Sequence, residues 1–315
     1  MKAWQFTGPG EPLVLAEVPV PEPGAGEVLV EIRAAGLCHT DVGILDDPGW
    51  LSQLAPRPLT LGHEVAGVVV ALGEGVEDVA LGARVGISPA GRTRPGLGQG
   101  GGYASHCLAF PEDLIPIPDG VGFAQAAAGT DAGKTARHAV GCRGQVEAGQ
   151  KVAVIGLGGI GQVATRLAVL RGADVVVAEP REDLWPIAKE LGAARVVGSL
   201  AEVEESSLDT VIDLAGVGVT TNQAISAVRK GGRVVQVGMA RLEATISTRD
   251  LIVKQVDLLG SSGGSTADIA DVYGLMATGD LDPILPTIGF DDIPDGLDRL
   301  RRGEVVGRLV AVYGS

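Results

Sequence analysis

The stretch KVAVIGLGGIGQVATRLAVLRGADVVVAE (residues 151–179) decides the fold class of this chain. It begins with a short β-branched run, KVAVIG (151–156), which is typical of a buried strand. Apolar residues then recur at helical spacing in QVATRLAVLRGA (162–173), and ADVVVAE (173–179) has the composition of a second buried strand. Strands that alternate with helices of this length indicate a parallel, doubly wound sheet, so we predict an α/β protein.

The glycines between the first strand and the helix predict a dinucleotide site. GLGGIG fits the pattern G-x-G-x-x-G, directly after a strand and at the start of a helix, which is the context that this motif requires. The first two glycines allow a tight turn and a close approach of the pyrophosphate, and the third allows close packing of helix on strand. The helix N-terminus supplies N–H groups to the phosphates. The predicted phosphate-binding residues are Gly156, Gly158, Gly159, Ile160 and Gly161.

An acidic residue supports this interpretation over an ordinary strand–turn–helix. Glu179 ends the second strand, 23 residues after Gly156, where a carboxylate is expected to bind the adenosine ribose. A carboxylate there accepts a hydrogen bond from the 2′-hydroxyl and repels a 2′-phosphate, so we expect NAD rather than NADP. Arg181, two residues later, can soften that repulsion, and NADP therefore stays an alternative.

The texture of the chain divides it into three segments. Residues 1–133 hold short strand-like runs such as EVLVEI (27–32) and HEVAGVVVAL (63–72), separated by turn clusters, as in a β-rich domain. Residues 134–262 alternate strands with helices; the further strand candidates are LDTVIDLAG (208–216), GRVVQVG (232–238) and VDLLGS (256–261). Residues 263–315 predict two helices and a last strand, GRLVAVY.

Composition limits the partners and the compartment. The net charge of −14 argues against a nucleic-acid partner, because phosphate backbones require a basic face. No apolar leader segment and no long apolar run is present, so we expect a cytoplasmic protein with no membrane partner. The three cysteines cannot form a disulfide framework.

A cysteine beside a histidine in AAGLCHTDVG (34–43) raises the question of a metal. Cys38 and His39 are neighbours whose side chains diverge, so one metal is more easily held by Cys38 and a residue from another loop. His63, in TLGHEVAG, has a suitable setting, and a catalytic zinc takes about three protein ligands with one open position. On spacing alone, a Cys38–His63 metal pair and two unrelated structural residues remain equal alternatives.

The residues Cys38-His39-Thr40-Asp41 and Gly62-His63-Glu64, followed by the glycine motif, resemble the zinc-dependent medium-chain alcohol dehydrogenases over nearly the whole chain. The resemblance implies a GroES-like β-rich catalytic domain (1–133 and 263–315) and a Rossmann domain (134–262). It also implies hydride transfer between an alcohol and NAD. The rival interpretations are a zinc-free reductase of the quinone or enoyl type and a non-catalytic, nucleotide-binding redox sensor.

The resemblance also assigns roles around the metal. Cys38, His63 and Asp131 become ligands of one catalytic zinc, although Asp131 would also suit the N-cap of a helix. Asp41 orients a ligand imidazole. Thr40 takes the proton of the alcohol.

Further positions face the metal or the cofactor by the same resemblance. Glu64 lies beside the metal and approaches it when the coordination changes. His39 faces the pyrophosphate, Thr135 contacts the nicotinamide ring, and Val237 lines the cofactor pocket. Trp50 falls either in a substrate-lining loop or in ordinary packing.

The chain departs from the family pattern in three places. The segment 91–102 has no cysteine, so we expect no structural zinc, and Gly43 stands where many members carry a relay histidine. The third ligand is Asp131 rather than cysteine, as in some secondary-alcohol members.

The strand predicted at 256–261 would end the sheet and pair with a second copy, giving a homodimer or homotetramer.

Overall fold

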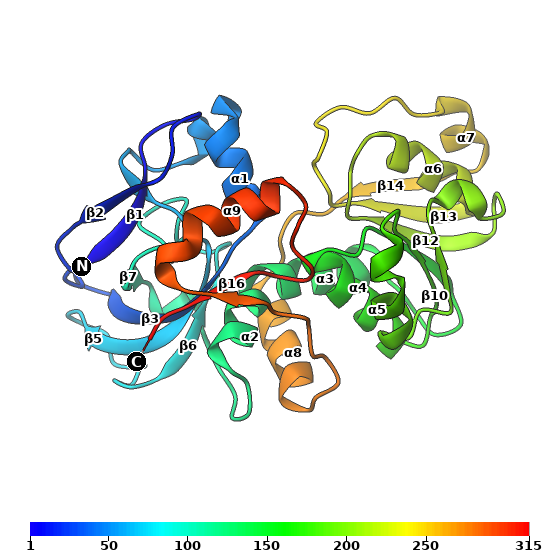
Figure 1. Ribbon diagram of the computed structural model, residues 1–315. Coiled ribbons are helices and arrows are strands. Elements are labelled where there is room, and N and C mark those ends of the chain that lie inside the picture. The colour runs from blue at the N-terminus through cyan, green and yellow to red at the C-terminus, as the bar shows by residue number, and fades with distance from the viewer. Residues whose placement is uncertain (315) are drawn as a thin grey trace. The chain divides into compact units, whose positions relative to one another are not determined.

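The computed structural model describes residues 1–314, which form two compact units (Figure 1). Unit 1 combines Met1–Lys134 with Ser265–Ser315, and unit 2 is Thr135–Gly264. The domain limits expected from the sequence, after residues 133 and 262, lie one and two residues away from these boundaries. No helix among residues 1–314 is long and apolar enough to cross a bilayer.

Unit 1 is built on a mainly antiparallel sheet in the order β15-β16-β3-β5-β6-β8, with β7 paired to β3. The strands are β3 (Val28–Gly36), β5 (Glu64–Leu72), β6 (Arg84–Ile87), β7 (His106–Ala109), β8 (Leu114–Pro116), β15 (Thr287–Ile288) and β16 (Val310–Val312). A second sheet, in the order β2-β1-β4, consists of β1 (Lys2–Phe6), β2 (Val14–Glu17) and β4 (Leu59–Thr60). The β-rich character predicted for this part of the chain is therefore present.

Short helices complete unit 1. They are α1 (His39–Asp46), α2 (Phe123–Ala128), α8 (Thr266–Ala277) and α9 (Ile293–Arg301), the π-helical turn η3 (Gly129–Gly133), and the 3-10 turns η1 (Pro48–Gln53), η2 (Pro111–Asp113) and η7 (Phe290–Asp292). Helices α1 and α9 lie side by side (Figure 1). Their apolar faces meet in a buried core that includes Ile44, Leu297 and Leu309.

Unit 2 is a six-stranded parallel sheet in the order β11-β10-β9-β12-β13-β14. The strands are β9 (Lys151–Ile155), β10 (Asp174–Ala178), β11 (Arg195–Val197), β12 (Leu208–Asp213), β13 (Val228–Gln236) and β14 (Asp257–Gly260). In chain order this arrangement is 3-2-1-4-5-6, the doubly wound order of dinucleotide-binding domains. The strand order reverses between β9 and β12, where such folds bind their ligand.

Helical segments connect these strands. They are α4 (Gly159–Leu170), α5 (Trp185–Glu190), α6 (Val219–Ala227), α7 (Thr248–Val253) and the 3-10 turns η5 (Glu182–Leu184) and η6 (Leu200–Glu202). Two further segments, α3 (Lys134–Arg137) and the π-helical η4 (His138–Arg143), precede β9. A buried apolar core joins the sheet to α6 and includes Val211, Ile225 and Val234.

The predicted α/β class with a GroES-like and a Rossmann part is confirmed. Two strand predictions were incomplete. β13 begins at Val228, before the predicted start at 232, because it continues through Gly231 and Gly232 with an irregular register against β12. β11 was not predicted, since three residues on the rim of the sheet carry no periodic pattern.

Candidate metal centre and nucleotide site

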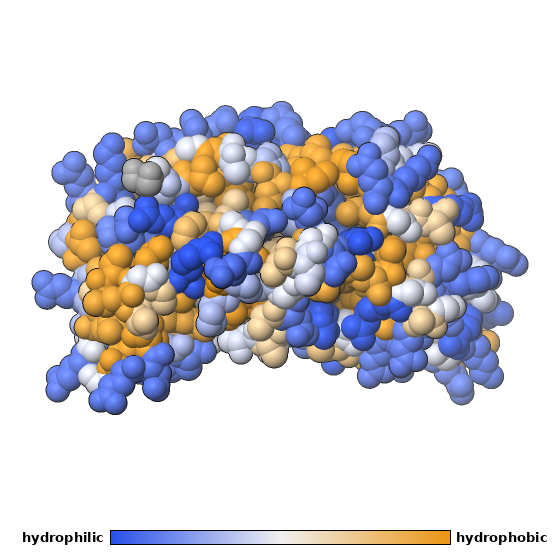
Figure 2. Space-filling view, turned by 90° about the horizontal axis from the view of Figure 1, so that it is seen from below, coloured by the Kyte–Doolittle hydropathy of each residue, from blue (hydrophilic) through white to orange (hydrophobic). Residues whose placement is uncertain are grey.

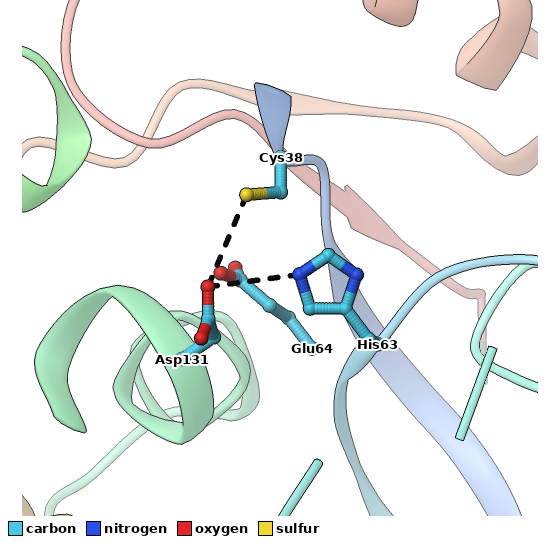
Figure 3. Close-up of side chains that lie close together, drawn as sticks. All are labelled: Cys38, His63, Glu64 and Asp131. Atoms are coloured by element: carbon cyan, nitrogen blue, oxygen red, sulfur yellow. Dashed lines mark hydrogen bonds and ion pairs between the residues drawn. The ribbon is translucent and has the colours of Figure 1, made fainter. Parts of the chain in front are cut away.

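Four side chains that can bind a metal converge in unit 1 (Figure 3). The ligand atoms of Cys38, His63, Glu64 and Asp131 all lie within 4.8 Å of one another. Cys38 and His63 are buried, and Asp131 is partly buried. The pairing suggested by the sequence between Cys38 and a residue of another loop is therefore present.

The register of two antiparallel strands brings Cys38 and His63 together. Gly36, the last residue of β3, is paired with Glu64, the first residue of β5. Cys38 follows Gly36 by two residues and His63 directly precedes Glu64, so both leave the sheet at the same end. Gly36 is required here, because a Cβ atom at this position would lie 1.8 Å from Glu64 Oε2.

Asp131 reaches the same place from a helical segment. It lies in the π-helical turn η3, which continues α2 without a break and passes into α3. The N-cap role considered for Asp131 is wrong, because the helical run begins at Phe123 with Gly122 as its N-cap. Single π-helical turns inside helices are frequent at functional sites.

The distances within the cluster suit a shared cation. Asp131 Oδ2 lies 3.6 Å from His63 Nε2 and 3.9 Å from Cys38 Sγ, as the dashed lines of Figure 3 mark. Thiolate, imidazole and carboxylate together form a donor set that zinc accepts. The residues present therefore fit the metal that the family resemblance implies.

Asp41 fixes the orientation of the His63 ring. His63 Nδ1 lies 3.2 Å from Asp41 Oδ1, which leaves Nε2 turned toward Cys38 and Asp131. A metal-binding histidine usually makes such a bond from its second ring nitrogen. Asp41 Oδ2 accepts hydrogen bonds from the Cys38 N–H at 3.1 Å and from the Tyr103 hydroxyl at 2.9 Å.

Arg308 is a member of the cluster that the sequence analysis missed. Its guanidinium pairs with both carboxylate oxygens of Glu64, with Nε 2.9 Å from Oε2, and its Nη2 lies 3.4 Å from Asp131 Oδ2. All of Glu64 and most of Arg308 are buried. The arginine precedes the last strand, and the only available signal was its place beside apolar residues in GRLVAVY. Because both oxygens of Glu64 are paired with Arg308 while Asp131 meets this arginine through Oδ2 alone, Cys38, His63 and Asp131 are the better candidates for metal ligands.

A second buried cation, Lys134, also touches the cluster. Its Nζ lies 3.8 Å from Asp131 Oδ1, so the two oxygens of this carboxylate face different partners. Burial by itself would raise the pKa of Asp131, but the bond with His63 and the charges of Lys134 and Arg308 hold that pKa well below its usual range. Asp131 is therefore a carboxylate in the ionised form that a metal requires.

Burial and charge act in opposite directions on Glu64 and His63. Burial raises the pKa of Glu64 to about 7, and the Arg308 guanidinium limits the rise. Burial lowers the pKa of His63, but Asp41 and Asp131 outweigh this effect and raise it above its usual value. The negative groups around His63 thus favour a positive charge on or beside its ring.

Of the other residues predicted in unit 1, Thr40 contacts the cluster, whereas in the described part of the chain no side-chain contact with the cluster is seen for His39 or Trp50. The Cys38 thiol lies 3.5 Å from the Thr40 hydroxyl, so Thr40 belongs to the cluster. His39, the first residue of α1, is exposed. Trp50 packs partly buried against the apolar core of unit 1, and its Nε1 lies 3.1 Å from where a Cβ at Gly43 would stand.

The glycine motif of unit 2 has the structural context that the sequence predicted. Gly156 follows β9 with a φ of +90°, and Gly158 is the N-cap of α4. A Cβ atom at Gly161 would lie 2.0 Å from the Gly156 carbonyl oxygen, so only glycine permits this turn to close. Gly159 and Ile160 form the first turn of α4.

Glu179 lies against this turn. Its Oε2 accepts the Leu157 N–H at 2.8 Å and its Oε1 accepts the Arg181 N–H at 3.0 Å. Val237 follows β13, and its N–H donates to the carbonyl of Asp213 at the end of β12. Thr135 is the first residue of unit 2.

Two family models match the chain. The one described as zinc-binding dehydrogenase matches residues 159–278, and the one described as alcohol dehydrogenase GroES-like domain matches residues 24–119. Among curated proteins, an alcohol dehydrogenase of Geobacillus stearothermophilus is 32% identical over 329 residues, covering 95% of this chain and 96% of the relative. An alcohol dehydrogenase of Moraxella sp. (strain TAE123) is 29% identical and covers 99% of each chain.

Solved structures give the same result. Acetophenone reductase from Geotrichum candidum, in complex with NAD, superposes with a TM-score of 0.89 at 33% identity, covering 99% of this chain and 96% of that one. The alcohol dehydrogenase of Aeropyrum pernix superposes with a TM-score of 0.90 at 28% identity, covering 99% and 100%. The chain thus belongs to the zinc-type medium-chain alcohol dehydrogenases and interconverts alcohols with carbonyl compounds through a nicotinamide cofactor.

Proposed function

We propose that this protein is an NAD-preferring dehydrogenase of secondary alcohols that uses one zinc ion, held by Cys38, His63 and Asp131. The observation that carries the proposal is the convergence of these three side chains within 4.8 Å of one another, with Glu64 engaged by Arg308. When bound, zinc supplies Lewis-acid polarisation of the substrate oxygen, and the nicotinamide ring accepts the hydride.

The chain's own residues hold and move the proton. The Thr40 hydroxyl lies beside Cys38 and accepts the hydrogen bond of the substrate hydroxyl. It can only relay the proton, giving up its own as it accepts the new one, because a neutral hydroxyl does not hold a second proton. Because Gly43 stands in place of a relay histidine, position 43 offers no imidazole for this proton, and the ribose of a bound nicotinamide cofactor together with water would have to carry it away. Asp41 keeps the His63 ring in the orientation that points Nε2 to the centre.

The preference for secondary alcohols and their ketones rests on two observations. The third ligand is an aspartate, a variation that resembles some secondary-alcohol members of the family. A similar structure at 33% identity is an acetophenone reductase. A panel of primary, secondary and benzylic alcohols with NAD tests the proposal. We expect the highest kcat/KM for 1-phenylethanol or a short secondary alcohol, and a clear preference for ethanol would contradict it.

A single zinc per chain is proposed because hydrogen bonds hold the segment 91–102. Asp113 Oδ2 accepts the Thr93 N–H at 2.6 Å, and the Thr93 hydroxyl accepts the Phe110 N–H at 2.9 Å. These bonds hold the loop at Thr93, and the segment has no cysteine that could bind a second zinc. The zinc-free reductase and the redox sensor both predict a protein without zinc, so elemental analysis of the purified protein separates them from this proposal.

We also propose a homodimer, or a tetramer built from it, that resides in the cytoplasm. β14 ends the sheet of unit 2, its residues are mostly exposed, and Ile252, Val253 and Leu258 nearby are exposed apolar side chains. An unpaired edge of this kind favours pairing with a second copy. The face shown in Figure 2 carries apolar patches between hydrophilic side chains. The net charge of −14 opposes binding to nucleic acid, because the phosphate backbone is itself negative. No disulfide joins the cysteines of the described residues, which suits a reducing compartment.

A further inference from the structure

The position of Glu179 defines where the adenosine ribose would bind in unit 2. Both of its oxygens accept backbone N–H groups, from Leu157 in the glycine turn and from Arg181. The residue is 7% exposed and lies just after β10. A carboxylate held at this place binds the ribose 2′-hydroxyl of NAD and faces the 2′-phosphate of NADP.

Arg181 is the one basic residue between Glu179 and Trp185. Its backbone N–H touches Glu179, so its side chain starts within reach of a phosphate on the ribose. The guanidinium, however, is bound by Asp183: Nη2 lies 2.8 Å from Oδ2, and Nε lies 3.4 Å from Oδ1. This two-point contact matches the planar fork of arginine to one carboxylate.

We propose that Asp183 is a specificity-determining residue that holds Arg181 and thereby denies NADP the cation needed to bind its 2′-phosphate. The inference rests on the nucleotide site of the proposed function. Asp183 acts in two ways, because it occupies the guanidinium and also adds a negative charge near the phosphate. NAD, which carries only a hydroxyl at this position, is insensitive to both effects.

The charge state and exposure of the pair support this role. The bond with Asp183 raises the pKa of Arg181, and the bond with Arg181 lowers the pKa of Asp183, so both groups are ionised at neutral pH. The side chains are 39% and 63% exposed. Exposed pairs of this kind contribute little to stability, so breaking the pair should change nucleotide choice and leave the fold intact.

The test measures binding rather than catalysis. NADH and NADPH are titrated by fluorescence into the wild-type protein and the variants Asp183→Asn, Arg181→Gln and Arg181→Gln/Asp183→Asn. We expect Asp183→Asn to lower the Kd for NADPH by roughly five- to tenfold and to leave the Kd for NADH within about twofold. This is about the size of effect that removing one solvent-exposed charge produces. The gain should shrink between low and high salt, because the interaction is electrostatic and exposed.

Two matched variants separate the role of the pair from a general change of charge. Glu182→Gln removes one negative charge from the neighbouring residue and leaves Arg181 and Asp183 in place, so the Kd for NADPH should change less than about twofold. In the double variant most of the gain should disappear, since the released guanidinium is gone.

The inference is overturned if Asp183→Asn leaves the NADPH:NADH ratio of Kd values unchanged, or if Glu182→Gln or the double variant shows the same gain. A wild-type protein that binds NADH while Asp183→Asn has no effect would contradict this inference alone. A wild-type protein that binds neither nucleotide would contradict the proposed function as well.

Discussion

His63 Nε2 lies 3.6 Å from Asp131 Oδ2, and this contact joins the turn before β5 to a π-helical turn 68 residues further along the chain. Neither residue takes part in a hydrophobic periodicity that would have predicted this contact. Their meeting beside Cys38 brings three residues from separate parts of the chain into a group that could hold a metal ion.

Asp41 should control metal affinity through its bond to His63. Asp41→Asn keeps the size of the side chain but removes the charge and one acceptor, so we expect zinc affinity to fall roughly 10- to 100-fold. Tyr103→Phe, which removes only the hydroxyl bonded to Asp41, should cost about 1 kcal/mol of stability and leave zinc affinity near wild type. Competition with a chromogenic chelator measures both variants. Equal zinc affinity in Asp41→Asn and wild type would show that Asp41 does not orient the ligand.

Gly36 should be intolerant of any side chain. A Cβ atom there would lie 1.8 Å from Glu64 Oε2, so Gly36→Ala must displace a buried carboxylate or the paired strands and should destabilise the protein by roughly 1–3 kcal/mol. Gly274 lies in α8, where a Cβ atom would meet nothing within 4 Å beyond the backbone of its own helix, and Gly274→Ala should stabilise by up to about 1 kcal/mol. Urea unfolding of both variants provides the comparison. A Gly36→Ala protein as stable as wild type would mean that Glu64 is free to move.

Arg308 should matter mainly because it neutralises Glu64. Arg308→Met leaves a buried carboxylate without its partner and should cost roughly 3–5 kcal/mol. Adding Glu64→Gln removes that charge, so the double variant should recover a substantial part of the loss. The double-mutant cycle is read from chemical denaturation. If the double variant is no more stable than Arg308→Met, packing rather than charge explains the role of the arginine.

Cys107 and Cys142 should differ in reactivity. Burial raises the pKa of Cys107 to about 12, whereas Cys142 is exposed. Iodoacetamide at mildly alkaline pH should therefore label Cys142 and spare Cys107 until the protein unfolds, as mass spectrometry of tryptic peptides would show. The unfolded thiol, with the ordinary pKa of 9.0, loses its proton before the folded one does, so the free energy of unfolding should fall as the pH rises above 9.0. Cys107→Ala should lessen that fall. Rapid labelling of Cys107 in the folded protein would refute the prediction.

Local patterns were sufficient to predict the sheet of unit 2 and its glycine turn. Strands β9 and β10 and helix α4 each carry their own periodicity, and Glu179 follows at a fixed distance from Gly156. Strand β11 was not predicted, because three residues at the edge of the sheet are too few to show a periodic pattern.

The metal cluster was only partly predictable. Cys38 and His63 could be paired as candidates from their turn settings and the family resemblance. Arg308 could not, because its contact with Glu64 spans 244 residues and depends on the pairing of β16 with β3. The direction of the Arg181 side chain was equally hidden, since sequence gives its distance from Glu179 but not its bond to Asp183.

Zinc content of two variants at position 131 tests the central claim most directly. Asp131→Asn keeps the shape of the side chain but loses the anionic oxygen that faces His63 and Cys38, whereas Asp131→Cys supplies a thiolate that zinc also accepts. Elemental analysis beside rates of alcohol oxidation is the measurement, with wild-type protein carrying one zinc per chain as the reference. The account predicts that Asp131→Asn loses most of its zinc and its turnover and that Asp131→Cys keeps its zinc. A fully active Asp131→Asn protein with one zinc per chain would contradict it.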